Sequence, residues 1–374
     1  MLPGPDVRPA HAALKVGELA AAQWKVVAAV TEVAAVVAGE DDEGLVGSAP
    51  HLLGEYREQL TDLKVQHLEW GVAAVGQTQA SKPFERRVRG PRGRTAMRTE
   101  APGGAVANTL AGLGALGVRT AFIGRVCDDS LGKFYANTMQ QAGTDFVNTP
   151  VAGGELPTSR SMIFVSEDGE RSMSTYLGIS AELGTEDVPL EVAKETEIVF
   201  LEGYLFDKEK GKEAFKRLAK TCRSAGGKAG IAISDPFCVE RHRFDFLHLI
   251  QNDLDYVIGN DDEIKSLFET DDLDVALGKT AEICDLVICT RGKNGVSVMR
   301  DGQRIDHRAK PVVPVDTTGA GDQFASGFFF GLVSGCDIDT CCQMGNVAAA
   351  EVISHIGPRP HEAISKIFAK AGLI

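Results

Sequence analysis

The chain of 374 residues lacks any apolar run near the roughly 18 residues that a membrane-spanning helix needs. Its nearest candidate, residues 28–39, is short and contains Glu32. The N-terminal stretch also lacks the unbroken apolar core of a signal peptide, because Lys15, Glu18 and Lys25 interrupt it. These absences argue against a membrane protein and predict a cytoplasmic one.

Basic residues are in the minority, since 39 Lys and Arg face 52 Asp and Glu and give a formal net charge of −13. This balance argues against duplex DNA and anionic membranes as partners, because both attract clustered Lys and Arg. The eight cysteines include no CxxC pair, which argues against a zinc knuckle. Cysteines without such spacing predict buried free thiols.

The chain has two unlike parts. Residues 1–98 hold 12 basic and 12 acidic residues, which leaves 27 basic and 40 acidic residues and the whole net charge in residues 99–374. All eight cysteines and 16 of the 17 phenylalanines also follow residue 98. In the first part, Ala-rich and Val-rich stretches predict helices over residues 12–38 and 50–70. The basic, Gly-containing and Pro-containing tract at 82–98 predicts a solvated linker rather than a nucleic-acid contact.

The second part alternates apolar, strand-like runs with helical segments. Continuous apolar strands between helices predict a parallel sheet covered on both faces, hence a three-layer α/β/α domain. The expected strands are residues 120–123, 198–201, 228–233, 256–259 and 286–290. Two further runs, 160–165 and 171–177, flank an Asp-Gly pair and predict a β-hairpin that leaves the sheet as a lid.

The stretch around residues 312–333 carries the strongest chemical signal. A strand-like run at 312–315 precedes Gly319-Ala320-Gly321, and an apolar, helix-compatible segment follows from Phe324. Small residues at a helix N-terminus leave backbone N–H groups free to bind an anion such as a phosphate. Asp322 beside this site would accept the proton of a hydroxyl that attacks phosphorus. The alternative role for Asp322 is a helix cap.

Asp316–Asp322 resembles the DTxGAGD signature of the ribokinase-like (PfkB) family of sugar and nucleoside kinases. Further stretches resemble other motifs of the family in the same order: GGAVAN at 103–108, GRVCDDSLG at 124–132, NDDE at 260–263 and TRGKNG at 290–295. The resemblance covers roughly residues 100–372. It implies the ribokinase-like fold and a small-molecule kinase.

The resemblance also implies roles for single residues. Asp322 would be the general base, and the backbone of Gly319, Ala320 and Gly321 would form the anion hole. Mg²⁺ with ATP would be held largely through water, which suits the reluctance of magnesium to dehydrate. The ATP-binding residues would be Asn260, Glu263, Thr290, Gly292 and Asn346, of which Asn260 and Glu263 would also face the metal. The acceptor would meet Gly103, Gly104 and Asn108, and Asp316 and Thr318 would hold a monovalent cation such as K⁺ or serve as turn and cap residues.

The acceptor follows from two shorter elements. GERSM at 169–173 with TYLG at 175–178, and SDPF at 234–237, resemble the adenosine kinase branch of the family. This resemblance implies that the γ-phosphate of ATP passes to the 5′-hydroxyl of adenosine. A plain sugar such as ribose, fructose or 2-keto-3-deoxygluconate is the alternative acceptor. The expected partners are ATP and such a small molecule, and we expect a monomer or a homodimer.

Residues 1–98 depart from the family pattern. The family opens with a strand that carries G-x-G-N and then an Asp that binds sugar hydroxyls, and neither motif occurs here. We therefore expect an atypical segment, out of frame or disordered, and an incomplete first strand and lid; a divergent extension is the alternative. Without the substrate Asp, a non-catalytic nucleoside-binding or sugar-binding relative is a second hypothesis for function.

Overall fold

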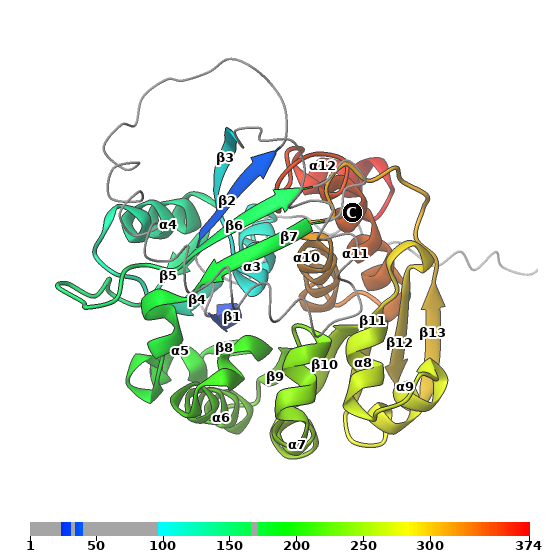
Figure 1. Cartoon of the computed structure of the whole chain (residues 1–374). Helices are drawn as coiled ribbons and strands as arrows, with labels where there is room; N and C mark the ends of the chain where they lie inside the picture. Colours follow the sequence, from blue (N-terminus) through cyan, green and yellow to red (C-terminus); the bar gives the residue numbers. More distant parts are fainter. Residues whose placement is uncertain (1–23, 31–33, 40–95, 166–170) are drawn as a thin grey trace, which may run out of the picture. The chain divides into compact units, whose positions relative to one another are not determined.

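The computed structural model describes residues 24–30, 34–39, 96–165 and 171–374. Contacts between residues divide the chain into two compact units, residues 1–37 with 99–374 and residues 38–98. Of the second unit, the described residues are only the ends of strands β2 (Ala34–Gly39) and β3 (Ala96–Pro102). The first unit carries the fold and the site (Figure 1).

A nine-stranded sheet forms the centre of the first unit, in the order β13-β12-β11-β10-β9-β8-β1-β4-β5. Its neighbours pair in parallel except at β12 and β13, which pair antiparallel at one edge. The strands are β1 (Trp24–Val30), β4 (Thr120–Gly124), β5 (Thr144–Phe146), β8 (Thr196–Glu202), β9 (Lys228–Ala232), β10 (Tyr256–Asn260), β11 (Leu286–Thr290), β12 (Val296–Arg300) and β13 (Gln303–His307). All five strands expected after residue 102 are therefore present.

Strand β1 corrects the prediction for the first part of the chain. The helix expected over residues 12–38 is wrong where the structure describes it, because residues 24–30 and 34–39 are strands. Far from leaving the first strand incomplete, β1 lies inside the sheet between β8 and β4, and Val26 is fully buried. A short apolar run can fold as a helix or as an inner parallel strand, and the two neighbouring strands select the second. The helix expected at 50–70 and most of the linker expected at 82–98 lie outside the described residues.

Helices cover both faces of the sheet. Along β8, Val199 and Leu201 belong to one apolar core, whereas Ile198 and Phe200 belong to the other. This alternation means that each face packs against its own layer, which confirms the three-layer α/β/α prediction. The first face carries α5 (Leu190–Lys194), α6 (Glu209–Ser224), α7 (Pro236–Asp253), α8 (Asp261–Leu267) and α9 (Leu273–Ala281). The second face carries α3 (Ala105–Ala115), α4 (Ser130–Gln141), α10 (Ala320–Val333), α11 (Ile338–Val352) and α12 (Ile364–Lys370).

The predicted lid hairpin is confirmed. Strands β6 (Arg160–Val165) and β7 (Arg171–Tyr176) pair antiparallel and belong to a separate four-stranded sheet in the order β3-β2-β6-β7. Asp129, within the GRVCDDSLG stretch, fastens the base of this hairpin. Its carboxylate accepts hydrogen bonds from the Gly132 N–H at 2.7 Å and from the N–H and hydroxyl of Thr158 at 2.9 and 2.7 Å. One side chain therefore caps α4 and anchors the start of β6.

The strand expected at residues 312–315 is wrong. These residues form a loop in which Val313 is 87% exposed, and the Val315 N–H donates to the Ile353 carbonyl rather than to a neighbouring strand. Pro311 and Pro314 supply no N–H, so this run cannot extend a ladder of backbone hydrogen bonds. The helix expected after it does form, as α10.

The cysteines are free thiols, as predicted, and six of the eight are buried. Burial raises the pKa of Cys238, Cys284 and Cys341 to about 12, so these thiols stay protonated near neutral pH. Among the described residues, no helix has the length and apolar character to cross a membrane.

The position of β1 predicts that Val26→Asp strongly destabilises the chain, because an unpaired carboxylate would lie in the apolar core. We expect a loss of about 3 kcal/mol or more in the free energy of unfolding, measured by urea denaturation. The exposed Val313→Asp is the matched control and should change that free energy by less than about 0.5 kcal/mol. Equal effects of the two substitutions would contradict the central placement of β1.

Candidate active site

A cavity of about 510 Å³ opens at the carboxyl ends of the parallel strands. Its wall includes Asn260 at the end of β10, Thr290 at the end of β11, and the turn Thr317–Asp322 that leads into α10. Ligands of open α/β sheets bind at this edge, because loops and helix N-termini converge there. The predicted site residues come from segments far apart in sequence and, with the exception of Asp316 and Asn346, they line this one cavity.

The turn before α10 depends on Gly319. This residue adopts φ +80° as the N-cap, and a Cβ atom there would lie 2.5 Å from the Pro358 carbonyl oxygen. Beneath the turn, the fully buried Asp316 accepts hydrogen bonds from the N–H groups of Thr318 and Gly357, both at 2.9 Å. At Gly321 a Cβ atom would meet only open space. The turn is thus fixed from below and open toward the cavity.

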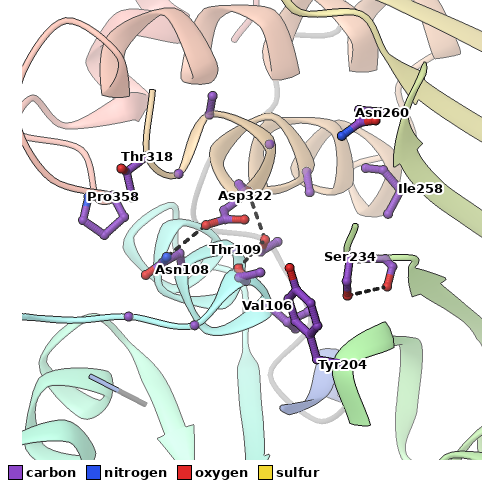
Figure 2. Close-up of a pocket in the computed structure, with 18 of the residues that line it drawn as sticks. Val106, Asn108, Thr109, Tyr204, Ser234, Ile258, Asn260, Thr318, Asp322 and Pro358 are labelled. Atoms are coloured by element: carbon purple, nitrogen blue, oxygen red, sulfur yellow. Dashed lines mark hydrogen bonds between the residues drawn. The ribbon is translucent and has the colours of Figure 1, made fainter. Parts of the chain in front are cut away.

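Helices α3 and α10 pack closely at Gly112, where a Cβ atom would lie 2.4 Å from the Ser326 hydroxyl. This contact places Asn108, which the sequence predicts to bind the phosphoryl acceptor, beside Asp322. The Asn108 Nδ2 donates to the Asp322 Oδ2 at 2.9 Å, and the Thr109 hydroxyl donates to the Asp322 carbonyl at 3.0 Å (Figure 2). The structure therefore joins the GGAVAN stretch to the DTTGAGD stretch at the one carboxylate expected to act as a base.

The position of Asp322 bears on its two predicted roles, a general base and a helix cap. The N-cap of α10 is Gly319, and Asp322 stands three residues further on, in the first turn. Its half-buried carboxylate points toward Asn108, between Thr318 and Pro358 on one side and Tyr204 on the other (Figure 2). A carboxylate so placed lines the cavity and has the positive end of a helix beside it. This geometry favours a chemical role over a cap.

On the other side of the cavity, Asn260 and Glu263 form a capping box at the start of α8. The Glu263 N–H donates to the Asn260 Oδ1, and the Asn260 N–H donates to the Glu263 Oε2, both at 2.9 Å. The Asn260 Nδ2 donates to the second oxygen, Glu263 Oε1, at 2.5 Å. Burial raises the pKa of Glu263 to about 8, against its ordinary value of 4.5, although the hydrogen bond from the Asn260 backbone opposes that shift.

Not all of the residues predicted to bind ATP line the cavity. Thr290 and Gly292 line the cavity with Asn260 and Glu263, and Gly292 adopts φ +51° in the turn that the TRGKNG stretch predicts. Asn346 does not line it; its Nδ2 lies 3.2 Å from the His307 Nδ1 and donates to the Arg308 carbonyl at 3.4 Å. Its contact with ATP stays a prediction.

Several cavity residues were not predicted from the sequence. Val106, Phe200, Tyr204 and Ile258 supply apolar and aromatic surface, and Ser159, Arg160, Ser161 and Thr175 belong to the lid hairpin or its approach. Apolar residues at strand ends look the same in sequence whether they face a core or a ligand, so no local signal separates them. Ser234, which the sequence indicated only as part of the SDPF stretch, also lines the cavity. It adopts φ +74°, a conformation that is uncommon for residues other than glycine and that often occurs at functional sites.

No group of three or more His, Cys, Asp or Glu side chains suited to a metal ion occurs in the described part of the chain. The described residues alone therefore supply no all-protein cage for a metal ion. A divalent cation here would keep most of its water and bind through few protein groups, as magnesium commonly does.

A three-layer α/β/α domain with a glycine turn, a carboxylate and a β lid around one cavity defines a class of small-molecule phosphotransferases. Residues 72–363 match the pfkB family of carbohydrate kinases, which is more than half of the chain. The chain belongs to this family. The match begins inside the segment 1–98, so the family resemblance extends further toward the N-terminus than the motifs alone indicated.

Curated and solved relatives agree with this assignment. The chain is 28% identical over 254 residues to an uncharacterized sugar kinase of Archaeoglobus fulgidus, covering 66% of this chain and 96% of that one. It is 29% identical over 248 residues to a fructokinase of Klebsiella pneumoniae, covering 63% and 78%. Among solved structures, an adenosine kinase from Sinorhizobium meliloti is similar at 34% identity and a TM-score of 0.78, over 94% of this chain and 100% of that one. A probable sugar kinase from Rhizobium etli is similar at 33% identity with the same TM-score and coverage.

The turn before α10 predicts opposite effects for two neighbouring glycines. Gly319→Ala should lower the free energy of unfolding by about 1–3 kcal/mol, because alanine is strained at positive φ and its methyl group would overlap Pro358. Gly321→Ala should leave that free energy unchanged or raise it by up to about 1 kcal/mol, since its methyl group meets open space inside a helix. Urea denaturation of both variants measures the difference, and equal destabilisation would contradict this turn geometry.

The raised pKa of Glu263 predicts a pH-dependent stability. Between pH 4.5 and about 8 the folded chain keeps a proton that the unfolded chain has lost. The stabilising contribution of Glu263 is therefore fully present below pH 4.5 and is lost as the pH rises through 8. Glu263→Gln stays neutral, so its stability relative to wild type should rise between pH 5.5 and 8.5. Urea denaturation in EDTA-containing buffer measures this difference; a constant difference across the range would contradict the pKa.

Proposed function

We propose that the chain transfers the γ-phosphate of ATP to a hydroxyl group, with the 5′-hydroxyl of adenosine as the first acceptor to test. The observation that carries this proposal is the placement of the Asp322 carboxylate against Asn108 at the open glycine turn of α10. Membership of a family of carbohydrate kinases supports the reaction class. The site roles given below extend that family assignment to single residues of this chain.

In the proposed reaction, the acceptor hydroxyl oxygen forms a bond to the γ-phosphorus while its proton passes to the Asp322 carboxylate. The bond from the γ-phosphorus to the bridging oxygen breaks, and ADP leaves with that oxygen. The backbone N–H groups of Gly319, Ala320 and Gly321 would stabilise the charge on the moving phosphoryl group. The phosphorylated product, ADP and the proton, which Asp322 would pass on to solvent, account for every atom of the two reactants.

The nucleotide would occupy the side of the cavity formed by Asn260, Glu263, Thr290 and Gly292, with Asn346 beyond it. A putative ribokinase from E. coli was solved with ATP and Mg²⁺, and its 17% identity to this chain supports the shared fold. The oxygens of Asn260 and Glu263 already accept hydrogen bonds within their capping box, so they fit contact with Mg²⁺ through water. Mg²⁺ would neutralise charge on the phosphates when bound.

The acceptor would meet Gly103, Gly104 and Asn108. Two aromatic residues, Phe200 and Tyr204, line the same cavity with Val106 and Ile258, a surface suited to a flat purine base. The similarity to the Sinorhizobium meliloti adenosine kinase supports the same acceptor. Relatives named fructokinase and 5-dehydro-2-deoxygluconokinase support the alternative, a plain sugar or sugar acid.

We also propose that Asp316 and Thr318 hold a monovalent cation such as K⁺ beside the turn Thr317–Asp322, the anion turn. The Thr318 hydroxyl oxygen is buried and has no hydrogen-bond partner in the described structure, and the adjacent Asp316 carboxylate is buried with it. A cation would satisfy that oxygen and add positive charge near the moving phosphoryl group. The alternative role of these residues is structural support of the turn, and the two hydrogen bonds that Asp316 accepts are consistent with that role.

Asp322→Asn tests the base. Asn keeps the size of Asp but takes no proton, so turnover should fall about 10²–10⁴-fold while the Kd for ATP stays within about twofold. A coupled ADP-release assay and ATP titration measure the two quantities. Wild-type turnover of Asp322→Asn with every acceptor would contradict the assignment.

The same assay over adenosine, inosine, ribose, fructose and 2-keto-3-deoxygluconate tests the acceptor. We expect the highest kcat/KM with adenosine. A higher value for fructose or for the sugar acid would favour the plain-sugar alternative. Tight acceptor binding without ADP release from any compound would favour a non-catalytic binding protein.

A further inference from the structure

The segment that follows α11 runs along the anion turn and is firmly held there. The Gly357 N–H donates to Asp316, and the Pro358 carbonyl accepts from the Gln323 side chain at 3.3 Å. The far end of the segment is fixed where the rings of His355 and His361 stack with centroids 3.6 Å apart. The backbone of residues 357–361 is therefore positioned by contacts on both sides.

Arg359 leaves this segment toward α3. Its Nε donates to the Asn108 Oδ1 at 3.3 Å, and its Nη2 lies 3.3 Å from the Met139 sulfur on α4. Asn108 is 4% exposed, and its Nδ2 in turn donates to the Asp322 Oδ2 at 2.9 Å. A cation, an amide and a carboxylate thus stand in line, and the last two belong to the wall of the cavity.

The hydrogen bonds from Arg359 to Asn108 and from Asn108 to Asp322 allow only one favourable orientation of the Asn108 amide. A guanidinium group has donors alone and a carboxylate has acceptors alone, so the amide oxygen must face Arg359 and the amide nitrogen must face Asp322. Rotation of the amide by 180° would set its N–H groups against the cation and its oxygen against the carboxylate. Without Arg359, nothing described on the oxygen side of the amide would select between the two orientations.

We propose that Arg359 is a positioning residue for phosphoryl transfer, which fixes the Asn108 amide so that the amide holds the Asp322 carboxylate in its reactive orientation. Asn108 then engages the Asp322 Oδ2 and fixes the orientation of the carboxylate relative to the acceptor hydroxyl. The proposal rests on the role of Asp322 as the base. It assigns a function to the Gly-Pro-Arg-Pro stretch at 357–360.

The charges around Arg359 fit this role. Burial lowers the pKa of Arg359 to about 10, while the nearby Tyr135 and Asp322 act in the opposite direction. The guanidinium therefore keeps its charge near neutral pH. The upward influence of Asp322 on the Arg359 pKa reflects the attraction between this guanidinium and that carboxylate.

A double-mutant cycle on kcat tests the proposal, with wild type, Arg359→Met, Asn108→Ala and the double variant. Arg359→Met should lower kcat about 10-fold to 100-fold, the value of a charge-assisted hydrogen bond, with the KM for ATP within about twofold. Because Arg359 acts through Asn108, adding Arg359→Met to Asn108→Ala should lower kcat by no more than about threefold further. Additive losses, or wild-type kcat for Arg359→Met, would overturn the proposal.

Arg243→Met is the matched control. Arg243 is also half-buried and charged, but it donates to the Ser266 carbonyl and pairs with Glu269 on the opposite face of the sheet. Its loss should change stability without changing kcat. Arg359→Lys, which keeps the charge and one donor, should retain kcat within about fivefold of wild type. If Arg359→Met does not fold, Arg359→Leu replaces it in the cycle, with the same expected result because leucine has no hydrogen-bond donor to offer Asn108.

Asp322→Asn in the same assay separates the two proposals. A large loss in Asp322→Asn with an unchanged Arg359→Met overturns only the role of Arg359. Unchanged turnover in Asp322→Asn overturns the assignment of the base. If no acceptor is turned over, the cycle is measured on the free energy of urea unfolding, where a coupling below about 0.5 kcal/mol would overturn the Arg359–Asn108 contact itself.

Discussion

Close packing of α3 against α10 is the constraint on which the site depends. The two helices approach at Gly112, where no side chain larger than hydrogen fits beside Ser326 and Gln323. That approach sets Asn108 against Asp322 and lets the buried Gln323 side chain donate to the backbone carbonyls of Asn108 and Pro358. A wider spacing would separate the acceptor side of the cavity from the anion turn. The interior packing of one glycine therefore determines the geometry of a surface-accessible carboxylate.

Close contacts of this kind also explain why the sequence motifs consist of small residues around a few polar ones. Gly319 allows the turn to pass beneath Pro358, and Gly132 allows α4 to begin against the carbonyl of Cys127. Both carboxylate oxygens of Asp129 and of Asp316 accept hydrogen bonds from backbone N–H groups or hydroxyls, and these hydrogen bonds hold loops in place. Asp322 differs from both because it lies at the cavity, where an acceptor can reach it. Burial and partners, rather than residue type, separate the two carboxylates that hold loops from the one that lines the cavity.

Most of the sheet could be predicted from the sequence because its inner strands are buried on both faces. Ile198, Val199, Phe200 and Leu201 read as one apolar run, and each second residue enters a different core. Strand β1 could not be predicted, since seven residues rich in Ala and Val suit a helix equally well until β8 and β4 supply partners. The loop at 312–315 was misassigned because its valines suggested a strand while the intervening proline removed the N–H that a strand needs. Arg359 escaped prediction because its partner lies 251 residues away, beyond the reach of any local pattern.

The distances along the chain also determine the order in which the protein can assemble. Asn108 and Asp322 are 214 residues apart, and the neighbouring strands β1 and β8 are separated in sequence by the segment that carries β2 to β7. Contacts this distant close large loops, which makes folding slow relative to helical proteins of local topology. During synthesis the segment around Asn108 would emerge long before α10, so a nascent chain could bury much of its sheet before Asp322 is present. With Asp322 in its proposed role, competence for phosphoryl transfer would arise in a late step of biosynthesis, when the C-terminal helices dock.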